Sequence, residues 1–574
     1  MKQALKNFKW YDFLIVVLIV GLIVNQVYFE MEMIDIMGEL ILKVQTGLPI
    51  AQIWETGRVM LLYAAIIMVS IIAGSFCSTM VAARYAKNLR SSIFKKVNKF
   101  SQEEINRFSI PSLITRSTND IAQVQMTLQM GLRMAIVAPT MGIFSVVKIL
   151  NKSAQLSWTA GIAVGVLLVV FVILFFAVVP AFGKTQKLTD RLNLVSRENL
   201  TGLRVIRAYN TEKQQEEKFE EVNEGLTRLH YYVGKVMSFM NPGMNLISNG
   251  LILTIYWLGA ALINNGSLQY YNLVQFTSYG MHILISFMFL SAVIVMLPRG
   301  IVSLKRICEV LKAESKITYG TFDGKTDKKG TIEFKNVSFR YPDAEMNVLE
   351  DINFVANQGE TVAFIGSTGS GKSTLVNLIP RFFDATFGDI YIDGVNIKEY
   401  SHKALNAKLG FVPQKGILFS GTVRDNIKYG AGDIDDKKIN QILKVAQATF
   451  VESLEGGLDY NIAQGGTNVS GGQRQRLCIA RAIAKDPEIY VFDDSFSALD
   501  YKTDKALRAA LAKHTKKATK IIVAQRVGTI LDADKIIVLD KGKMVGQGTH
   551  AELMKSCKIY QEIALSQLSK EELK

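Results

Sequence analysis

Long apolar runs in the first half of the chain constrain its fold more than any other feature. Each run is long enough, or nearly so, to cross a bilayer core of about 30 Å. Helices are expected, because a helix satisfies its backbone hydrogen bonds within one segment and lipid offers no partners. The runs cover residues 13–27, 59–83, 134–150, 156–182, 237–263 and 273–297. The sequence therefore predicts six transmembrane helices with both chain ends on one side.

The net charge of +15 fits nucleic acid, an anionic membrane surface or positive cytoplasmic loops as its explanation. Basic residues gather in two segments, 84–116 and 184–207, which lie between predicted spans. The first external loop is acidic instead, with Glu30, Glu32 and Asp35. The excess is thus topological, and nucleic acid is not expected as a partner. We predict a multi-pass protein of the cell's inner or plasma membrane, with both termini cytoplasmic.

The composition turns polar after the last span. We expect a membrane domain over residues 1–312, a linker over 313–329 and a soluble α/β domain over 330–574. Strand-like runs in the soluble part cover residues 332–341, 360–365, 390–392, 489–492, 520–524 and 535–540. The basic segments continue the helical period of the spans, and their tips, near 109–118 and 201–208, are candidates for contact with a soluble domain. Simple solvated loops are the alternative.

A phosphate-binding loop directly follows the strand at 361–365. Its glycines let backbone N–H groups turn toward a phosphate, its lysine reaches the outer phosphates, and its serine hydroxyl can bind Mg²⁺. A chance glycine-rich turn would lack the flanking strand and helix. The predicted ATP-binding residues are Gly366, Ser367, Thr368, Gly369, Ser370, Gly371, Lys372, Ser373 and Thr374.

Two further motifs lead to a family. Asp493 ends the apolar strand at 489–492, where a carboxylate would orient Mg²⁺. Between the two strands lies the turn Ser470, Gly471, Gly472 and Gln473. With these motifs the chain resembles the ABC transporters over nearly its whole length. The resemblance implies a six-helix membrane domain fused to an α/β P-loop nucleotide-binding domain that carries an α-helical subdomain.

The resemblance also implies ATP and Mg²⁺ as cofactors and roles for several residues. Tyr341 resembles the aromatic that stacks on adenine, although core packing is the alternative. Gln414 resembles the Mg²⁺-sensing glutamine, with Ser373 and Asp493 as the other expected Mg²⁺ ligands, and Asp500 lies in the loop that crosses between paired domains. In the family two such domains hold two ATP molecules head to tail, so residues 470–473 would serve the nucleotide of a partner.

Three positions depart from the family pattern. Asp494 stands where a glutamate normally polarises water, Gln525 where a histidine is normal, and Gln464 where a glutamate is frequent. Shortening the acid by one methylene can cost about a hundredfold in rate, and an amide cannot become cationic. We therefore expect an ATP-hydrolysing translocase whose own site binds ATP but hydrolyses it slowly. That pattern resembles the degenerate subunit of heterodimeric multidrug exporters.

Polar residues recur along one face of two predicted spans. They are Asn241, Asn245 and Asn249 on the fifth span and Gln275, Tyr279 and His282 on the sixth. Polar side chains in lipid face protein or water. A surface that lines a cargo cavity and hydrogen bonding between helices therefore both remain open. Methionine and phenylalanine near these spans favour a hydrophobic small molecule as cargo.

The leading hypothesis is a subunit of a heterodimeric multidrug exporter that works with a second half-transporter in the bilayer. A homodimeric exporter of lipid or peptide keeps the fold and changes the cargo. A non-transporting regulator, or a channel-like protein gated by ATP, is the alternative from another class.

Overall fold

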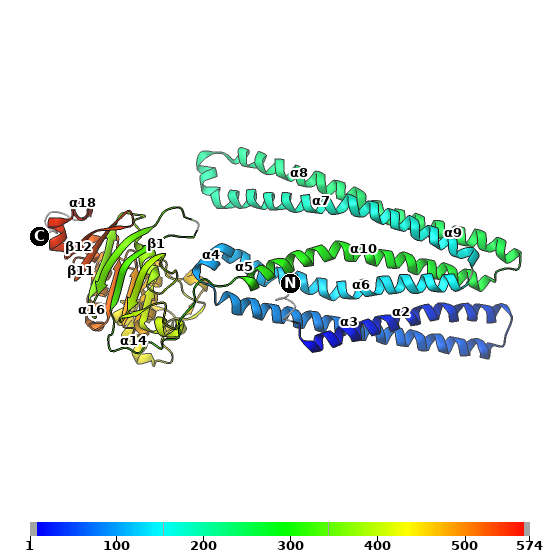
Figure 1. The fold of residues 1–574 in the computed structure, drawn as a ribbon, viewed down its shortest axis with the longest axis horizontal. Helices are drawn as coiled ribbons and strands as arrows, with labels where there is room; N and C mark the ends of the chain where they lie inside the picture. The colour runs from blue at the N-terminus through cyan, green and yellow to red at the C-terminus, as the bar shows by residue number, and fades with distance from the viewer. Residues whose placement is uncertain (1–7, 153, 343, 568–574) are drawn as a thin grey trace. The chain divides into compact units, whose positions relative to one another are not determined.

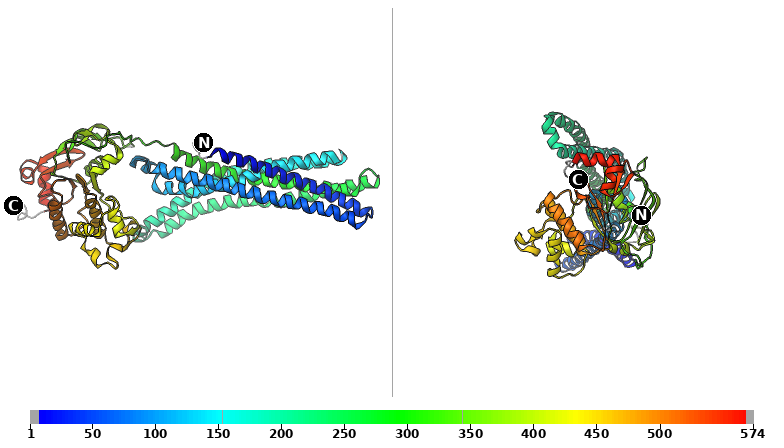
Figure 2. Two further views of the ribbon diagram at one scale, coloured as in Figure 1. Left: turned by 90° about the horizontal axis from the view of Figure 1, so that it is seen from below. Right: turned by 90° about the vertical axis from the view of Figure 1, so that its left-hand side faces the viewer.

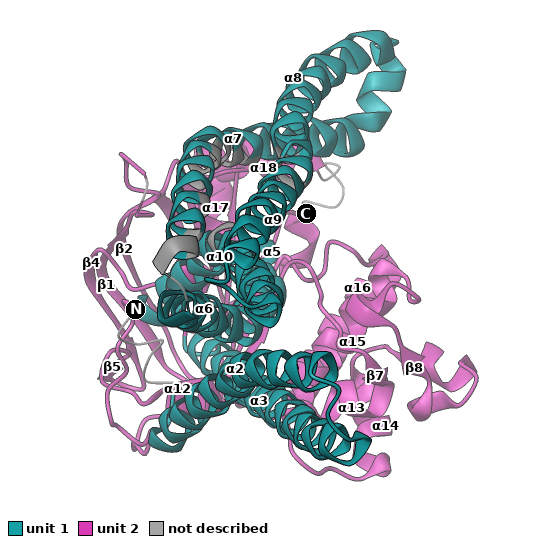
Figure 3. Ribbon diagram, turned by 90° about the vertical axis from the view of Figure 1, so that its right-hand side faces the viewer, with its two compact units in different colours: residues 1–99, 108–313 teal, residues 100–107, 314–574 magenta. Residues whose placement is uncertain are grey.

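The computed structural model describes residues 8–152, 154–342 and 344–567. The chain forms two compact units (Figure 3). The first comprises residues 1–99 and 108–313, and the second comprises residues 100–107 and 314–574.

The first unit consists of helices (Figure 1). They are α2 (Trp10–Gln45), α3 (Ile50–Val97), α5 (Ile110–Ser117), α6 (Asn119–Lys152), α7 (Ala154–Tyr209), α8 (Glu212–Ser238), α9 (Met240–Asn264) and α10 (Tyr270–Lys312). The helices α2, α3, α6 and α10 run alongside one another in both side views (Figures 1 and 2).

Five helical segments of the described part are long and apolar enough to cross a membrane. They are Trp10–Gln45, Ile50–Val97, Ile110–Lys152, Pro242–Asn264 and Tyr270–Lys312. The expected span at 156–182 lies in α7, where the described apolar stretch is the shorter Ser157–Val170. The described residues thus support five of the six expected spans.

The helix breaks follow proline and left-handed backbone. Ser109 has φ 61° and precedes α5, in which Pro111 occupies the first turn, where proline is tolerated. Pro242 likewise lies in the first turn of α9, next to the junction with α8. The expected tip at 201–208 is helical and belongs to the end of α7.

Apolar side chains lie both between the helices of this unit and on its outer surface, as expected in lipid. Val27, Met31, Phe276 and Ile283 are buried between helices. Phe76 and many other large apolar side chains are exposed. Without a surrounding aqueous phase there is no penalty for this arrangement.

The second unit contains two main sheets. The larger has the order β12-β11-β3-β10-β9-β6 and is parallel except for β12, and the smaller, β2-β1-β4-β5, is antiparallel. The strands are β1 (Ile332–Phe339), β2 (Leu349–Ala356), β3 (Thr361–Gly366), β4 (Phe387–Ile392), β5 (Val395–Asn396), β6 (Leu409–Val412), β9 (Ile489–Asp493), β10 (Thr519–Val523), β11 (Lys535–Asp540) and β12 (Lys543–Gly548). All six strand-like runs of the sequence form strands.

Strand β3 lies between two apolar cores because its side chains alternate. Val362 and Phe364 pack with the smaller sheet, and Ala363 and Ile365 pack on the opposite face with the helices. Both faces of a mostly parallel sheet are therefore covered, which explains why this strand is almost entirely apolar.

The main helices of the second unit are α11 (Lys372–Leu378), α12 (His402–Lys408), α13 (Val423–Lys428), α14 (Asp436–Val445), α15 (Gly471–Ala484), α16 (Tyr501–His514), α17 (His550–Ser556) and α18 (Lys558–Gln567).

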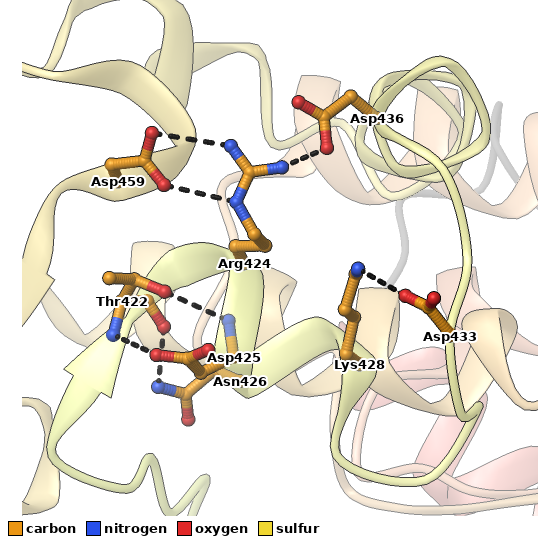
Figure 4. Close-up of polar contacts among 8 residues, drawn as sticks. All are labelled: Thr422, Arg424, Asp425, Asn426, Lys428, Asp433, Asp436 and Asp459. Carbon is orange, nitrogen blue, oxygen red and sulfur yellow. Dashed lines mark hydrogen bonds and ion pairs between the residues drawn. The ribbon is translucent and has the colours of Figure 1, made fainter.

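A helical subdomain is inserted between β6 and β9, and polar contacts hold it together (Figure 4). Arg424 of α13 pairs with Asp459 at 3.0 Å and with Asp436 of α14. Lys428 pairs with Asp433 at 2.7 Å. Because α13 also packs on α15, these contacts fix the support of the helix that begins at Gly471.

The expected linker packs on the second unit. Phe322 forms a bridge with Tyr400, and its N–H donates to the Glu399 carbonyl at 3.0 Å. Lys316 pairs at 2.5 Å with Glu103 of the short helix α4 (Gln102–Phe108). Residues 100–107 therefore belong to the second unit although they lie far away in the sequence.

Candidate functional site

The loop between β3 and α11 requires glycine at several positions. Gly369 and Gly371 have φ of 84° and 93°, in the region that glycine adopts without strain. A Cβ on Gly366 would lie 2.0 Å from the carbonyl oxygen of Leu539 on β11. The loop therefore folds tightly over the sheet edge and forms the backbone cradle expected of a phosphate site.

Lys372 lies across this loop. Its Nζ donates to the carbonyl oxygens of Gly366 at 2.8 Å and Ser367 at 2.7 Å. Burial lowers the pKa of Lys372, and the nearby Asp494 and Asp493 offset this only in part. An incoming phosphate would bring a negative charge next to this partly buried ammonium group and would stabilise its charged form.

Oxygen ligands for a divalent cation lie beside the lysine. The hydroxyl of Ser373 donates to Oδ1 of Asp493 at 2.8 Å. Burial raises the pKa of Asp493, and repulsion by Asp494 adds to this shift. Hydroxyl and carboxylate oxygens at this spacing fit Mg²⁺, which prefers hard oxygen ligands and completes its shell with phosphate and water.

Asp494 is held by two amides. Its Oδ2 accepts from Nε2 of Gln525 at 2.7 Å and from Nε2 of Gln414 at 3.3 Å. Its backbone has φ 48°, and its carbonyl oxygen accepts from the Ser497 hydroxyl at 2.9 Å. Burial raises the pKa of Asp494, and hydrogen bonds from Ser497 and Gln414 work against that shift. Two of the three departures from the family pattern, Asp494 and Gln525, are thus hydrogen-bonded to each other.

A cavity of about 620 Å³ opens over the loop. Most of the phosphate-loop residues line it, together with Gln414 and Gln525. The sequence analysis missed four further lining residues, Val348 and, from α18, Ile563, Ser566 and Gln567. No local motif marks them, because they reach the site only through long-range packing.

Gln567 anchors the backbone on both sides of Arg526. Its Nε2 donates to the carbonyl oxygen of Gln525 at 2.9 Å, and its Oε1 accepts from the N–H of Val527 at 2.8 Å. The last described residue of the chain therefore fixes the loop that carries Gln525.

Tyr341 packs in an aromatic group beside the phosphate loop. Its ring meets Phe339 and Phe383 edge-on, with centroid distances of 4.8 and 5.4 Å. Its hydroxyl lies 3.1 Å from the Thr374 hydroxyl. The ring is thus partly buried and tied to α11, a position that leaves both the stacking and the packing interpretation of Tyr341 in place.

Residues 470–473 do not line this cavity. Ser470 caps α15: its hydroxyl accepts from the Gln473 N–H at 3.2 Å, and Gln473 Oε1 accepts from the Ser470 N–H at 2.9 Å. Ser470 and Gly471 are exposed, with the helix N-terminus behind them. Asp500 is also exposed and caps α16 through the Thr503 N–H at 2.9 Å. Both turns are available to a partner.

The polar residues predicted to line a membrane cavity fall into three groups. Gln275 donates to the carbonyl oxygen of Asp35 on α2 at 3.0 Å, and the Tyr279 hydroxyl donates to that of Met31 at 3.4 Å, so both bridge helices. His282 lines a cavity. Asn245 and Asn249 are exposed on α9, and the side chain of Asn241 lies outside the described part of the structure.

This combination defines a class: a membrane protein with a helical transmembrane unit joined to a P-loop nucleotide-binding unit. The family model of the ABC transporter transmembrane region matches residues 13–294, and the family model of the ABC transporter matches residues 349–497. The chain belongs to the ABC transporter family. It is a half-transporter, with one transmembrane region fused to one nucleotide-binding domain.

Relatives cover almost the whole chain. An ABC transporter ATP-binding protein of Mycobacterium tuberculosis is 38% identical over 527 residues, which cover 90% of each chain. The protein YfiB of Bacillus subtilis, named in the same way, is 33% identical over 521 residues, again 90% of each. The structure of a bacterial Atm1-family ABC exporter with ATP bound matches with a TM-score of 0.79 over 98% of both chains. At 21% identity this last likeness establishes the fold alone.

Proposed function

We propose that this chain is one subunit of a heterodimeric, ATP-driven exporter. Its own phosphate-loop site binds ATP and hydrolyses it slowly. Its turn at residues 470–473 completes the hydrolytic site of a second, different half-transporter. ABC transporters are ATP-hydrolysing translocases, so the proposal concerns how the work is divided between two subunits.

The hydrogen bond from Gln525 to Asp494 carries this proposal. A base that activates water needs a carboxylate oxygen free to accept a proton. Here one of the two carboxylate oxygens, Oδ2, already accepts from two amides, which hold the side chain in place. Gln525 can donate to a phosphate but cannot carry the positive charge of a protonated histidine.

ATP binding, by contrast, keeps its full set of residues. The backbone of residues 366–371 and Lys372 would hold the phosphates, and Ser373 and Asp493 would hold Mg²⁺. When bound, Mg²⁺ neutralises part of the charge on the outer phosphates. Tight retention with slow cleavage would keep the two nucleotide-binding domains together while the partner's site turns over.

The exposed turn at Ser470 supports the contribution in trans. Its capping box leaves the N-terminus of the 14-residue helix α15 accessible, where backbone N–H groups favour an anion. The turn lies outside the cavity of its own chain. A nucleotide held by a second chain is the ligand that this arrangement suits.

The membrane part of the proposal follows the charge pattern. We place six spans in the bilayer of the cell's inner or plasma membrane, with α7 supplying the fourth, and both termini and the nucleotide-binding domain in the cytoplasm. The cargo would be a small molecule with a hydrophobic body. An apolar cavity of about 380 Å³, lined by residues such as Val146, Val164 and Phe287, supports such a cargo.

Purification of the tagged chain from its own membranes tests the proposal. We expect a second half-transporter to co-purify, with glutamate and histidine at the positions of Asp494 and Gln525. Isolation of the chain with copies of itself alone, together with rapid ATP hydrolysis, would favour a homodimer. Vesicle transport of a dye separates an exporter from an ATP-gated regulator, since a regulator consumes or binds ATP without moving the dye.

A further inference from the structure

Another cavity with polar lining residues belongs to the first unit, whereas the nucleotide site belongs to the second. It has a volume of about 500 Å³ and is enclosed by α2, α3, α6 and α10. One part of its wall is polar, with Gln26, Glu30, Ser75, Arg133 and His282. Another part is apolar and includes Met134, Val137 and Phe289. The cavity is therefore amphipathic.

Two opposite charges, Glu30 and Arg133, face this cavity without an ionic partner among the described residues. The expectation that Glu30 lies in an external loop was wrong, because α2 continues to Gln45. Glu30 accepts only from Nε2 of Gln26, at 2.9 Å, and its second oxygen is buried with no hydrogen-bond partner. Arg133 donates to the neutral hydroxyl of Ser75 at 2.5 Å. Both groups therefore keep hydrogen-bonding capacity that the described residues do not use.

Other charged residues of α2 and α6 do form ion pairs. Lys148 of α6 lies 2.5 Å from Glu32 and 2.7 Å from Asp35 of α2. A charge within a membrane domain is costly unless it is paired or serves a ligand. Glu30 and Arg133 form no such pair among the described residues, and both line the cavity.

His282 adds a third unsatisfied group. Its Nδ1 is buried and has no hydrogen-bond partner. Buried polar atoms in proteins are satisfied in the great majority of cases. Three incompletely satisfied side chains on one cavity indicate a polar ligand.

We propose that this cavity binds a zwitterionic amphiphile. Its acidic group would pair with Arg133, its ammonium group with Glu30, and its apolar body would lie along Met134, Val137 and Phe289. Only the transport of this ligand rests on the proposed export function, for which the ligand would be a class of cargo. Binding itself needs no ATP.

Molecules with fewer charges fit less well. A cation would leave Arg133 unpaired, and an anion would leave Glu30 unpaired. A neutral hydrophobic molecule would cover both charges and remove their water, which is the least favourable case. Only a ligand with both charges would neutralise both Glu30 and Arg133.

Three fluorescent probes that share a dansyl group and a five-carbon chain provide the test. Nε-dansyl-lysine is zwitterionic, dansylcadaverine lacks its carboxylate, and dansyl-aminohexanoate lacks its ammonium group. Binding is measured by fluorescence with the full-length chain and its co-purifying subunit in lipid nanodiscs, without nucleotide. We expect the zwitterion to bind at least about tenfold more tightly than either analogue. Equal affinities for all three probes would overturn the proposal without any variant.

Variants then assign each charge. Glu30→Gln should abolish the preference for the zwitterion over dansyl-aminohexanoate and keep the preference over dansylcadaverine. Arg133→Gln should do the reverse. Glu39→Gln, which removes a charge paired with Lys43 outside the cavity, should leave both preferences unchanged. Unchanged preferences in Glu30→Gln or Arg133→Gln would contradict the proposal.

Transport separates this inference from the proposed function. Selective binding of the zwitterion without ATP-driven uptake into inverted vesicles would count against the exporter and leave the cavity assignment standing. Uptake of other cargo with no selectivity among the three probes would do the opposite.

Discussion

The side-chain amide of Gln525 donates to Oδ2 of Asp494 at 2.7 Å, and Gln414 donates to the same oxygen at 3.3 Å. The hydrogen bond from each amide stabilises the ionised carboxylate, which makes the carboxylate less ready to accept a proton from water. Asp494 and Gln525, two departures from the family pattern that lie apart in the sequence, therefore form one hydrogen-bonded pair. If hydrolysis at this site is slow, as we propose, a faster site should require both positions to change.

We predict that Asp494→Glu alone raises the hydrolysis rate at this site only a few-fold, because Gln525 still engages the carboxylate. Asp494→Glu with Gln525→His should raise it by about a hundredfold, in the range of general acid–base catalysis. Single-turnover hydrolysis is measured in a complex whose other site is inactivated. Asp494→Asn serves as the control and should show no gain. Full activation by the single Asp494→Glu change would contradict the proposed coupling.

The second prediction separates the two sites of the complex. Ser470→Arg places a bulky cation in the turn offered to the partner's nucleotide, and it should reduce turnover of the complex more than tenfold. Lys372→Ala weakens ATP binding at the chain's own site, which we propose to be slow, and should reduce turnover only a few-fold. Steady-state ATP hydrolysis by the purified complex provides the comparison.

Ser453→Arg is the matched control, since Ser453 is an exposed serine of the same subdomain and bonds only to the Phe450 carbonyl. It should leave turnover unchanged. Equal losses in Ser470→Arg and Lys372→Ala would indicate two equivalent sites.

The parts of the predicted nucleotide site could be read from the sequence because they are local. The strand, the glycine loop and Lys372 are consecutive, and Asp493 ends a strand that must lie in the same sheet. The cap made by Ser470 and Gln473 is also local, so the spacing alone indicates a helix start. These features depend little on how distant segments pack.

Features that depend on packing were not predictable. The period that places Gln275 and Tyr279 on one helix face cannot tell whether a cavity or another helix lies opposite, and the structure brings α2 there. The contact of Gln567 with the loop at Gln525 has no sequence signature. The partner of a polar side chain on a long helix becomes known only with the tertiary fold.

Gln567 gives the third prediction. Gln567→Ala removes both hydrogen bonds that hold the backbone at Gln525 and Val527, each worth about 1 kcal/mol. Amide exchange at Val527 should accelerate about tenfold or more. Ser566→Ala is the control, because the Ser566 hydroxyl bonds only within its own helix, to Ile563. Unchanged exchange in Gln567→Ala would show that the loop is held by other contacts.

The last prediction concerns a buried ionic group that includes Lys408, at the end of α12. Lys408 lies 2.6 Å from Asp393 and 2.8 Å from Glu488, with only 7% of its side chain exposed and none of that of Asp393. Burial alone would lower the pKa of Lys408, but the two carboxylates outweigh it and raise the pKa, so the residue stays charged. Lys408→Met leaves two carboxylates without their cation and should destabilise the nucleotide-binding domain by about 3–5 kcal/mol. Chemical unfolding of the purified chain measures the loss, with Lys403→Met, an exposed position on the same helix, as the control. If both variants unfolded alike, Lys408 would have no structural role, whereas partial recovery in Lys408→Met with Asp393→Asn would identify the unpaired charge as the cause.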